Sequence, residues 1–298
     1  MHTRRMVAVA IAAVLAFAPA ASAEVKTGEF DYKQGDTVLA GFIAWDDAAK
    51  GKRPGVLVVH EWWGHNEHAR NQAKRLAEAG YVGFALDMYG KGKVATHAKD
   101  AEAFMNEATK DPAALAARFN AALELLKQDP RVDSEKIAAI GYCFGGSVVL
   151  GRARAGADLA AVVSVHGALA TKSPAEKGKV KARVLVLTGD ADPMIPPEQV
   201  EAFNAEMTTA GAKFQVVSYP GARHSFTNPA ADKAGMDALA YNPEADEVLG
   251  GDAGPIQGGL AMRTHDLLEA GSEVGIEVVE HQMHGLVAFG TRPVTEAS

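Results

Sequence analysis

Hydrophobic and polar residues alternate along the first part of the mature chain and then give way to short, continuous apolar runs. From about Val25 to Trp45, the alternation on either side of Gly35 and Asp36 predicts an antiparallel hairpin at a sheet edge. The run Val56–His60 is continuous, as in a strand that is buried on both faces. Similar apolar runs predict further strands at 81–86, 137–140, 161–165, 184–188 and 214–218.

Amphipathic segments fill several of the intervals between these strands. Residues 66–79 have helical periodicity. Asp111 and Pro112 are typical of an N-cap and a first helical residue, so a helix is expected to follow them. Two more helices are expected after residue 144 and over 197–209. This alternation predicts an α/β fold, a mostly parallel, doubly wound sheet with helices on both faces.

Composition and charge narrow the class of protein. The 298-residue chain is 48% hydrophobic and 22% charged and carries a net charge of −7. These values suit one soluble α/β domain with an ample core. The mildly acidic balance gives no indication of nucleic-acid binding, and the sequence has no basic patch interleaved with aromatic residues.

The first 23 residues have the pattern of a secretory signal peptide. Arg4 and Arg5 precede an apolar run over 6–17, and Ala21–Ala23 supplies small residues at the expected cleavage site. The run is short for a membrane span, although an uncleaved anchor is the alternative. We expect cleavage after Ala23 and export of the mature protein to a periplasm or the extracellular space, with no membrane attachment afterwards. The paired arginines leave a twin-arginine route open beside the general secretory route.

The only cysteine, Cys143, lies in the run 140–146, which reads I-G-Y-C-F-G-G. A predicted strand before it and small residues around it form the layout of a nucleophile elbow, G-x-S-x-G, with cysteine in place of serine. Backbone N–H groups at the start of the following helix stabilise negative charge on a thiolate or an oxyanion. The alternative is a small, buried core cysteine. Export argues against it, because an oxidising compartment favours paired cysteines.

Polar residues follow two of the other predicted strands. Asp190 and Asp192 come after the strand at 184–188, and His224 comes after the strand at 214–218. Because reacting groups gather at the carboxyl ends of parallel strands, these residues are expected to meet Cys143. The chain order of nucleophile, acid and histidine is that of the α/β-hydrolases. His224 is predicted to act as the base and Asp192 as the acid that orients it, with Asp190 as the alternative acid.

A second motif, H-E-W-W-G-H-N-E-H over 60–68, follows the first buried strand. A zinc site is disfavoured, because H-E-x-x-H needs a histidine where Gly64 stands and belongs within a helix. We expect an oxyanion loop, in which the backbone N–H of Trp62 pairs with that of Phe144. Trp62 and Trp63 then wall an apolar substrate pocket, the alternative being simple core packing.

The motifs H-E-W-W-G, G-Y-C-F-G-G, G-D-A-D-P and H-S-F occur in this order. They resemble those of the dienelactone hydrolase family of α/β-hydrolases, over roughly residues 25–246. The resemblance implies a catalytic triad of Cys143, Asp192 and His224. It also implies that a glutamate, here Glu61, interacts with the thiol and keeps it protected until substrate disturbs that contact. From the residues alone, Glu61 is a partly buried carboxylate near the thiol.

Two positions depart from dienelactone-specific members, which resemble one another in binding the substrate carboxylate through arginines. Lys91 and Asn228 occupy these positions here and are the predicted substrate-binding residues. Lysine is a point charge rather than a planar fork, and asparagine is uncharged. An anionic dienelactone is therefore a doubtful substrate for this chain.

The C-terminal segment does not follow the resemblance. We divide the chain into a signal peptide (1–23), a hydrolase domain (24–246) and an atypical tail (247–298). Residues 248–259 contain too much glycine and proline for a stable helix. A back-translation of this stretch, read one base out of frame, encodes an amphipathic helix, so we hypothesise a frameshift near Glu247. A genuine extension is the alternative.

The sequence as a whole predicts a hydrolase of small esters or lactones that works through a thioester acyl-enzyme. The competing hypothesis is a non-catalytic small-molecule-binding protein on the same scaffold. We expect no cofactor, no metal and no nucleic-acid partner, and a monomer or a homodimer.

Overall fold

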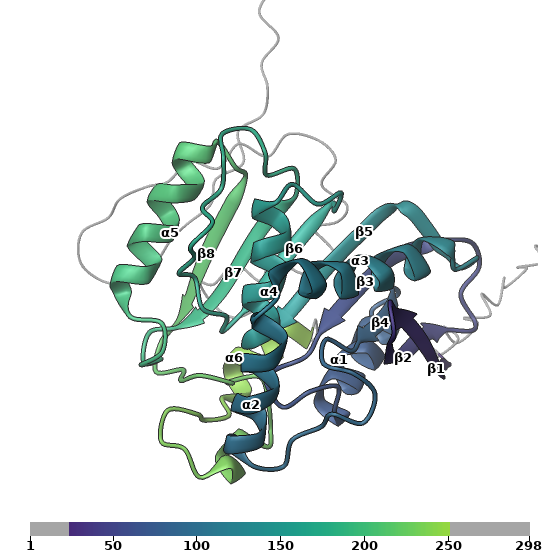
Figure 1. Cartoon of the computed structure of the whole chain (residues 1–298), viewed down its shortest axis with the longest axis horizontal. Coiled ribbons are helices and arrows are strands. Elements are labelled where there is room, and N and C mark those ends of the chain that lie inside the picture. The colour runs from purple at the N-terminus through teal and green to yellow at the C-terminus, as the bar shows by residue number, and fades with distance from the viewer. Residues whose placement is uncertain (1–23, 251–298) are drawn as a thin grey trace, which may run out of the picture.

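The computed structural model describes residues 24–250, which form one eight-stranded sheet flanked by helices (Figure 1). The strand order is β1-β2-β4-β3-β5-β6-β7-β8. The predicted signal peptide and most of the predicted tail, 251–298, lie outside the described residues, so these predictions stay open. Within 24–250, no helix is both long enough and apolar enough to cross a membrane.

The first two strands form the predicted hairpin at one edge of the sheet. Strands β1 (Val25–Gln34) and β2 (Thr37–Asp46) pair antiparallel across the turn at Gly35 and Asp36. Strand β2 also pairs antiparallel with β4 (Val82–Leu86). The hairpin therefore adds two antiparallel strands to an otherwise parallel sheet.

The other strands run parallel to one another, as the continuous apolar runs predict. They are β3 (Arg53–Val59), β4, β5 (Val132–Tyr142), β6 (Ala161–Val165), β7 (Arg183–Gly189) and β8 (Phe214–Tyr219). Their carboxyl ends therefore lie at one edge of the sheet, where polar residues follow β3, β4, β5, β6, β7 and β8.

Alternating residues of β3 face two separate apolar layers. Leu57 and Val59 belong to the core shared with α3 (Pro112–Gln128), α4 (Phe144–Arg154) and α5 (Pro197–Ala210). Val56 and Val58 belong to the core shared with α1 (Glu67–Glu78). Helices α4 and α5 lie in front of the sheet in Figure 1. The doubly wound α/β arrangement is confirmed.

Local sequence signals explain where two of the predicted helices begin. The Asn66 side chain accepts a hydrogen bond from Ala69 N at 3.4 Å and caps α1. The Asp111 carboxylate accepts from Ala113 N and Ala114 N, both at 3.0 Å, at the start of α3.

Three helical segments differ from the prediction. Helix α2 (Ala98–Thr109) was not predicted. Its N-cap residue His97 makes no side-chain capping bond, and the helix buries little more than Ala101 and Ala108. A short 3₁₀ helix, η1 (Ala231–Ala234), and α6 (Pro243–Gly250) follow β8. Helix α6 continues past the predicted domain boundary at residue 246, so its last residues belong to a helix that we did not expect there.

Candidate active site

Cys143 lies at a sharp turn between β5 and α4 and has a positive φ of 52° with a ψ of −114°, a strained conformation for a residue with a side chain. Two glycines make this turn fit. A Cβ at Gly141 would lie 2.1 Å from the carbonyl oxygen of Gly145, and a Cβ at Gly145 would lie 2.3 Å from that of Val59. Positions 141 and 145 therefore require glycine because the backbone packs too closely there to leave room for a side chain. The turn has the backbone geometry of a nucleophile elbow, with Cys143 at the carboxyl edge of the sheet.

The structure brings Asp192 and His224 together. His224 Nδ1 lies 2.8 Å from Asp192 Oδ2, and both side chains are almost fully buried. Asp192 follows β7 and His224 follows β8, so the pair links two neighbouring strand ends. The alternative acid, Asp190, is exposed, and its carboxylate accepts a hydrogen bond from Gly221 N at 2.6 Å. The geometry therefore favours Asp192 over Asp190.

The second ring nitrogen of His224 faces the cysteine. Nε2 is buried and has no partner that meets hydrogen-bond geometry within the described residues. The side chain of Cys143 is nevertheless close enough to affect the protonation of the His224 ring. Burial opposes the charged imidazolium, but Cys143 and Asp192 outweigh it and raise the pKa of His224 to about 10. A proton on His224 is thus stabilised from both sides.

Glu61 is 1% exposed and follows β3 at the same edge. Its carboxylate accepts hydrogen bonds from Ser225 Oγ at 2.7 Å and from Asn228 Nδ2 at 2.6 Å. The resemblance implies a contact with the Cys143 thiol, whereas the hydrogen bonds in this structure go to the loop that follows His224. Glu61 therefore ties the loop after β3 to the loop that carries the histidine.

The predicted oxyanion groups lie at two strand ends. Phe144 is the first residue of α4, so its N–H has no acceptor within the helix. Trp62 follows Glu61, and its carbonyl accepts a hydrogen bond from the hydroxyl of Tyr89 at 3.2 Å. Trp62 and Trp63 are half-buried, and their rings meet edge to face at 5.0 Å.

The histidines at 60 and 65 of the 60–68 motif bind backbone groups. His60 Nδ1 lies 2.6 Å from Glu61 O, and its Nε2 accepts from Met88 N at 3.1 Å. Burial lowers the pKa of His60 to about 4, so this ring is neutral and carries its proton on Nδ1. His65 Nε2 lies 2.9 Å from the carbonyl oxygen of Ala85. Between residues 24 and 250, no cluster of three or more metal-ligating side chains occurs.

Comparisons with known proteins identify the family of the chain. The sequence model of the dienelactone hydrolase family matches residues 39–249. The chain belongs to the dienelactone hydrolase family. It is an α/β-hydrolase and a carboxylic ester hydrolase, as the sequence predicts.

Individual relatives of this dienelactone hydrolase family member cover most of the described chain. The putative carboxymethylenebutenolidase of Methylorubrum extorquens is 30% identical over 209 residues, 67% of this chain and 72% of the relative. A solved structure named "m3DLH" is 40% identical, with a TM-score of 0.71, over 75% of this chain and 93% of that one. A dienelactone hydrolase-like promiscuous phosphotriesterase from metagenomic libraries is 37% identical, with the same TM-score and coverage.

The two positions predicted to bind substrate are otherwise engaged in this family member. Asn228 is buried, donates to Glu61 and accepts from Ala230 N at 2.9 Å. Lys91 pairs with Asp31 at 2.5 Å across the surface. Both side chains therefore already have polar partners within the protein.

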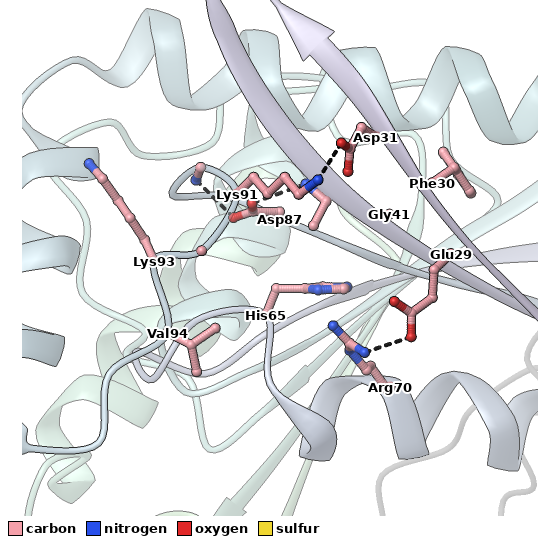
Figure 2. Close-up of a pocket in the computed structure, with 13 residues that line it drawn as sticks. Glu29, Phe30, Asp31, Gly41, His65, Arg70, Asp87, Lys91, Lys93 and Val94 are labelled. Carbon is pink, nitrogen blue, oxygen red and sulfur yellow. Dashed lines mark hydrogen bonds and ion pairs between the residues drawn. The ribbon is translucent and has the colours of Figure 1, made fainter.

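Lys91 lines a cavity of about 570 Å³ between the β1-β2 hairpin and the loop that follows β4. Figure 2 shows the ammonium of Lys91 directed at Asp31 and the guanidinium of Arg70 directed at Glu29. The cavity is lined by none of Cys143, Asp192 and His224. Lys91 therefore lines a cavity that the proposed triad does not share.

Sequence reasoning missed His166, which follows β6 at the same edge. Its Nδ1 accepts a hydrogen bond from the backbone N–H of Cys143 at 3.1 Å, and its ring lies 5.2 Å from that of His224. Its position after a buried parallel strand was the available signal, the same one that identified Asp192 and His224.

Proposed function

We propose that this protein hydrolyses small, uncharged esters or lactones through a triad of Cys143, Asp192 and His224. The observation that carries the proposal is the buried Asp192–His224 pair, whose free Nε2 faces a cysteine at a nucleophile elbow. Nucleophilic catalysis needs such a group, a base within reach of it and a third residue that orients the base.

The reaction proceeds in two halves. His224 Nε2 takes the thiol proton of Cys143, and the sulfur attacks the carbonyl carbon of the ester to form a tetrahedral oxyanion. The N–H groups of Trp62 and Phe144 stabilise that oxyanion. The carbon–oxygen bond to the alcohol then breaks, His224 returns its proton to the leaving oxygen, and a thioester remains on Cys143.

Water completes the second half. His224 takes a proton from a water molecule, which attacks the thioester carbonyl, and the carbon–sulfur bond breaks. The acid leaves and Cys143 regains its proton. With a lactone, the alcohol and the acid are released as one hydroxy acid. Asp192 keeps the proton of the neutral ring on Nδ1 and stabilises the imidazolium in both halves.

The substrate class follows from the charges near the site. The two positions at which dienelactone-specific members use arginine hold an asparagine that binds Glu61 and a lysine that pairs with Asp31. A substrate carboxylate would meet no dedicated cation from either position. We therefore infer a preference for neutral esters and lactones over an anionic dienelactone.

The cellular location remains part of the proposal. We propose that residues 1–23 are removed and that the mature enzyme works outside the cytoplasm, on the pattern of the sequence alone.

The test is hydrolysis of p-nitrophenyl acetate and of a simple lactone by residues 24–298 and by the Cys143→Ala variant. Circular dichroism of both proteins checks that they are folded. Turnover by the wild type and its loss in a folded variant support the thiol mechanism. A folded wild type without turnover favours the non-catalytic binding protein, and a fully active variant rules out Cys143 as the nucleophile.

A second candidate activity is hydrolysis of neutral phosphotriesters. It rests on the 37% identical relative that is named a promiscuous phosphotriesterase and on the absence of a free cation from positions 91 and 228 in this chain. Diethyl p-nitrophenyl phosphate is the matching substrate. Turnover that needs Cys143 would add this activity to the first, and lack of turnover would leave the ester proposal unchanged.

A further inference from the structure

Three non-glycine residues between 24 and 250 have positive φ angles: Cys143 at 52°, His166 at 41° and Ser225 at 57°. All three lie at the carboxyl edge of the sheet, after β5, β6 and β8. Such backbone angles cost energy and persist where the surrounding contacts fix them, often at functional sites. Cys143 is the proposed nucleophile and Ser225 binds Glu61, which leaves His166 without a role.

His166 connects the elbow to the loop of the catalytic histidine. It is fully buried, and its Nδ1 accepts from the N–H of Cys143 at 3.1 Å. That N–H is shared with the carbonyl oxygen of Val165 at 3.0 Å. Because Nδ1 is an acceptor, the proton of the neutral ring is on Nε2, which donates to Thr227 Oγ1 at 3.1 Å. One ring thus contacts both the nucleophile's backbone and the residue three positions after His224.

The ring of His166 also forms a wall beside His224. The two rings lie 5.2 Å apart, and Phe226 packs on His166 edge to face at 5.1 Å. His224 is held at one end by Asp192, while its Nε2 has no full hydrogen bond within the described residues. The packing against His166 therefore limits how far His224 can tilt away from the sulfur of Cys143.

The groups that face His166 keep it neutral. They are His224 in the loop after β8, His68 on α1, and Cys143 and Tyr142 at the end of β5. Burial, and then the charges that His224 and His68 can carry, hold the pKa of His166 well below its usual value. His166 can therefore stand beside a charged His224 without competing for its proton.

We propose that His166 is a positioning residue that sets the spacing between the sulfur of Cys143 and Nε2 of His224 during acyl transfer. The inference rests on the proposed function, because it assigns His166 to the same triad. It acts through the two residues that it holds and does not itself touch the substrate.

Two variants separate the contacts of His166. Thr227→Val removes the acceptor of the Nε2 proton and keeps the shape of the side chain. His166→Asn suits the left-handed backbone and keeps an acceptor near Cys143 N, but it removes the ring beside His224. Thr188→Val on β7 is the matched control, since the hydroxyl of this buried threonine has no partner within the described residues.

Both variants should lower kcat by about tenfold to 100-fold, because a small misplacement of reacting groups slows the chemical step. KM should change less than about threefold, because neither residue contacts the substrate. His166→Asn should lose more than Thr227→Val. The pKa of His224, about 10, sets the alkaline limb of the pH–rate profile. This limb should move to lower pH, because a His224 ring held less firmly beside Cys143 has its pKa raised less by that residue. The control should keep both kcat and the limb.

The readouts distinguish a positioning role from a structural one. If both folded variants lower the melting temperature but keep kcat and the alkaline limb, His166 is only structural and the inference is wrong. If His166→Asn fails to fold, Thr227→Val decides by the same two readouts. The proposed function fails only if the wild type shows no turnover that depends on Cys143. If that turnover is present, the variants test the role of His166 alone.

Discussion

Two polar regions of this molecule hold their charges in opposite ways. At the carboxyl edge, Glu61 and Asp192 are buried, and their partners are a serine, an asparagine and a histidine. Around the cavity beside the β1-β2 hairpin, the side chains of Lys91 and Asp31 are 57% and 48% exposed and simply pair with each other. The hydrogen bonds of the first region hold buried side chains in fixed positions. In the second region, water can solvate both charged groups when the ion pair separates.

The difference shows where a substitution should matter. An exposed ion pair is worth at most about 1 kcal/mol, because water solvates both partners when they separate. A buried donor left without its acceptor costs about 1–3 kcal/mol and also releases the loop that it held. Glu61 and Asp192 should therefore control activity, and the exposed pair of Lys91 and Asp31 should not.

The largest effect is expected from Asp192→Asn. The asparagine cannot stabilise the imidazolium of His224, so kcat should fall by a factor on the order of 10²–10⁴. The wild-type pKa of His224 is raised to about 10, so its imidazolium persists until the pH rises through that value. Without the carboxylate that pKa drops, and the alkaline limb moves to lower pH. Rate profiles with an alkyl ester, whose leaving group needs a proton, measure both effects.

Asp190→Asn is the matched control for this prediction. Asp190 is exposed and binds Gly221 N rather than the histidine, so its variant should keep the wild-type limb. A shift caused by Asp190→Asn and not by Asp192→Asn would reverse the assignment of the acid.

Glu61 should give the intermediate effect. In Glu61→Gln, the amide oxygen can still accept from Asn228 and the amide nitrogen can donate to Ser225 Oγ, so activity should stay within about tenfold. Glu61→Ala leaves both partners unpaired and should lower kcat by about 100-fold. Steady-state kinetics of the two variants separate hydrogen bonding from charge. Equal losses in both would favour a direct role of the charge at the thiol, which the family resemblance implies.

Lys91→Ala should have the smallest effect. We expect hydrolysis of a neutral ester to be unchanged and turnover of an anionic dienelactone to change less than about tenfold, roughly one contact's worth of binding energy. The matched variant Asp31→Asn breaks the same ion pair from the other side. A much larger loss confined to the dienelactone in Lys91→Ala would restore Lys91 as a substrate-binding residue.

Much of the fold followed from sequence patterns with a direct physical cause. Buried parallel strands need continuous apolar runs, and Asn66 and Asp111 cap helices with their own side chains. Helix α2 was missed because it has no capping side chain and buries few residues. The proposed frameshift near residue 247, a position within α6, stays a hypothesis. The family match ends close to that point, at residue 249.

Less of the site could be predicted. Strand ends pointed to Cys143, Asp192 and His224, because topology alone brings such residues to one edge. The partners of Asn228 and Lys91 could not be predicted, since they depend on which loop meets which in space. His166 had the same topological signal, but its role depends on a shared backbone N–H that no sequence pattern encodes.

The most direct test of the thiol mechanism is mass spectrometry of the protein after reaction with excess p-nitrophenyl butyrate. The reaction is quenched with acid within milliseconds of mixing. We predict a butyryl adduct on the peptide that contains Cys143, sensitive to hydroxylamine as thioesters are, and no adduct in Cys143→Ala. Sustained turnover by Cys143→Ala at the wild-type rate, with no adduct on either protein, would contradict the account.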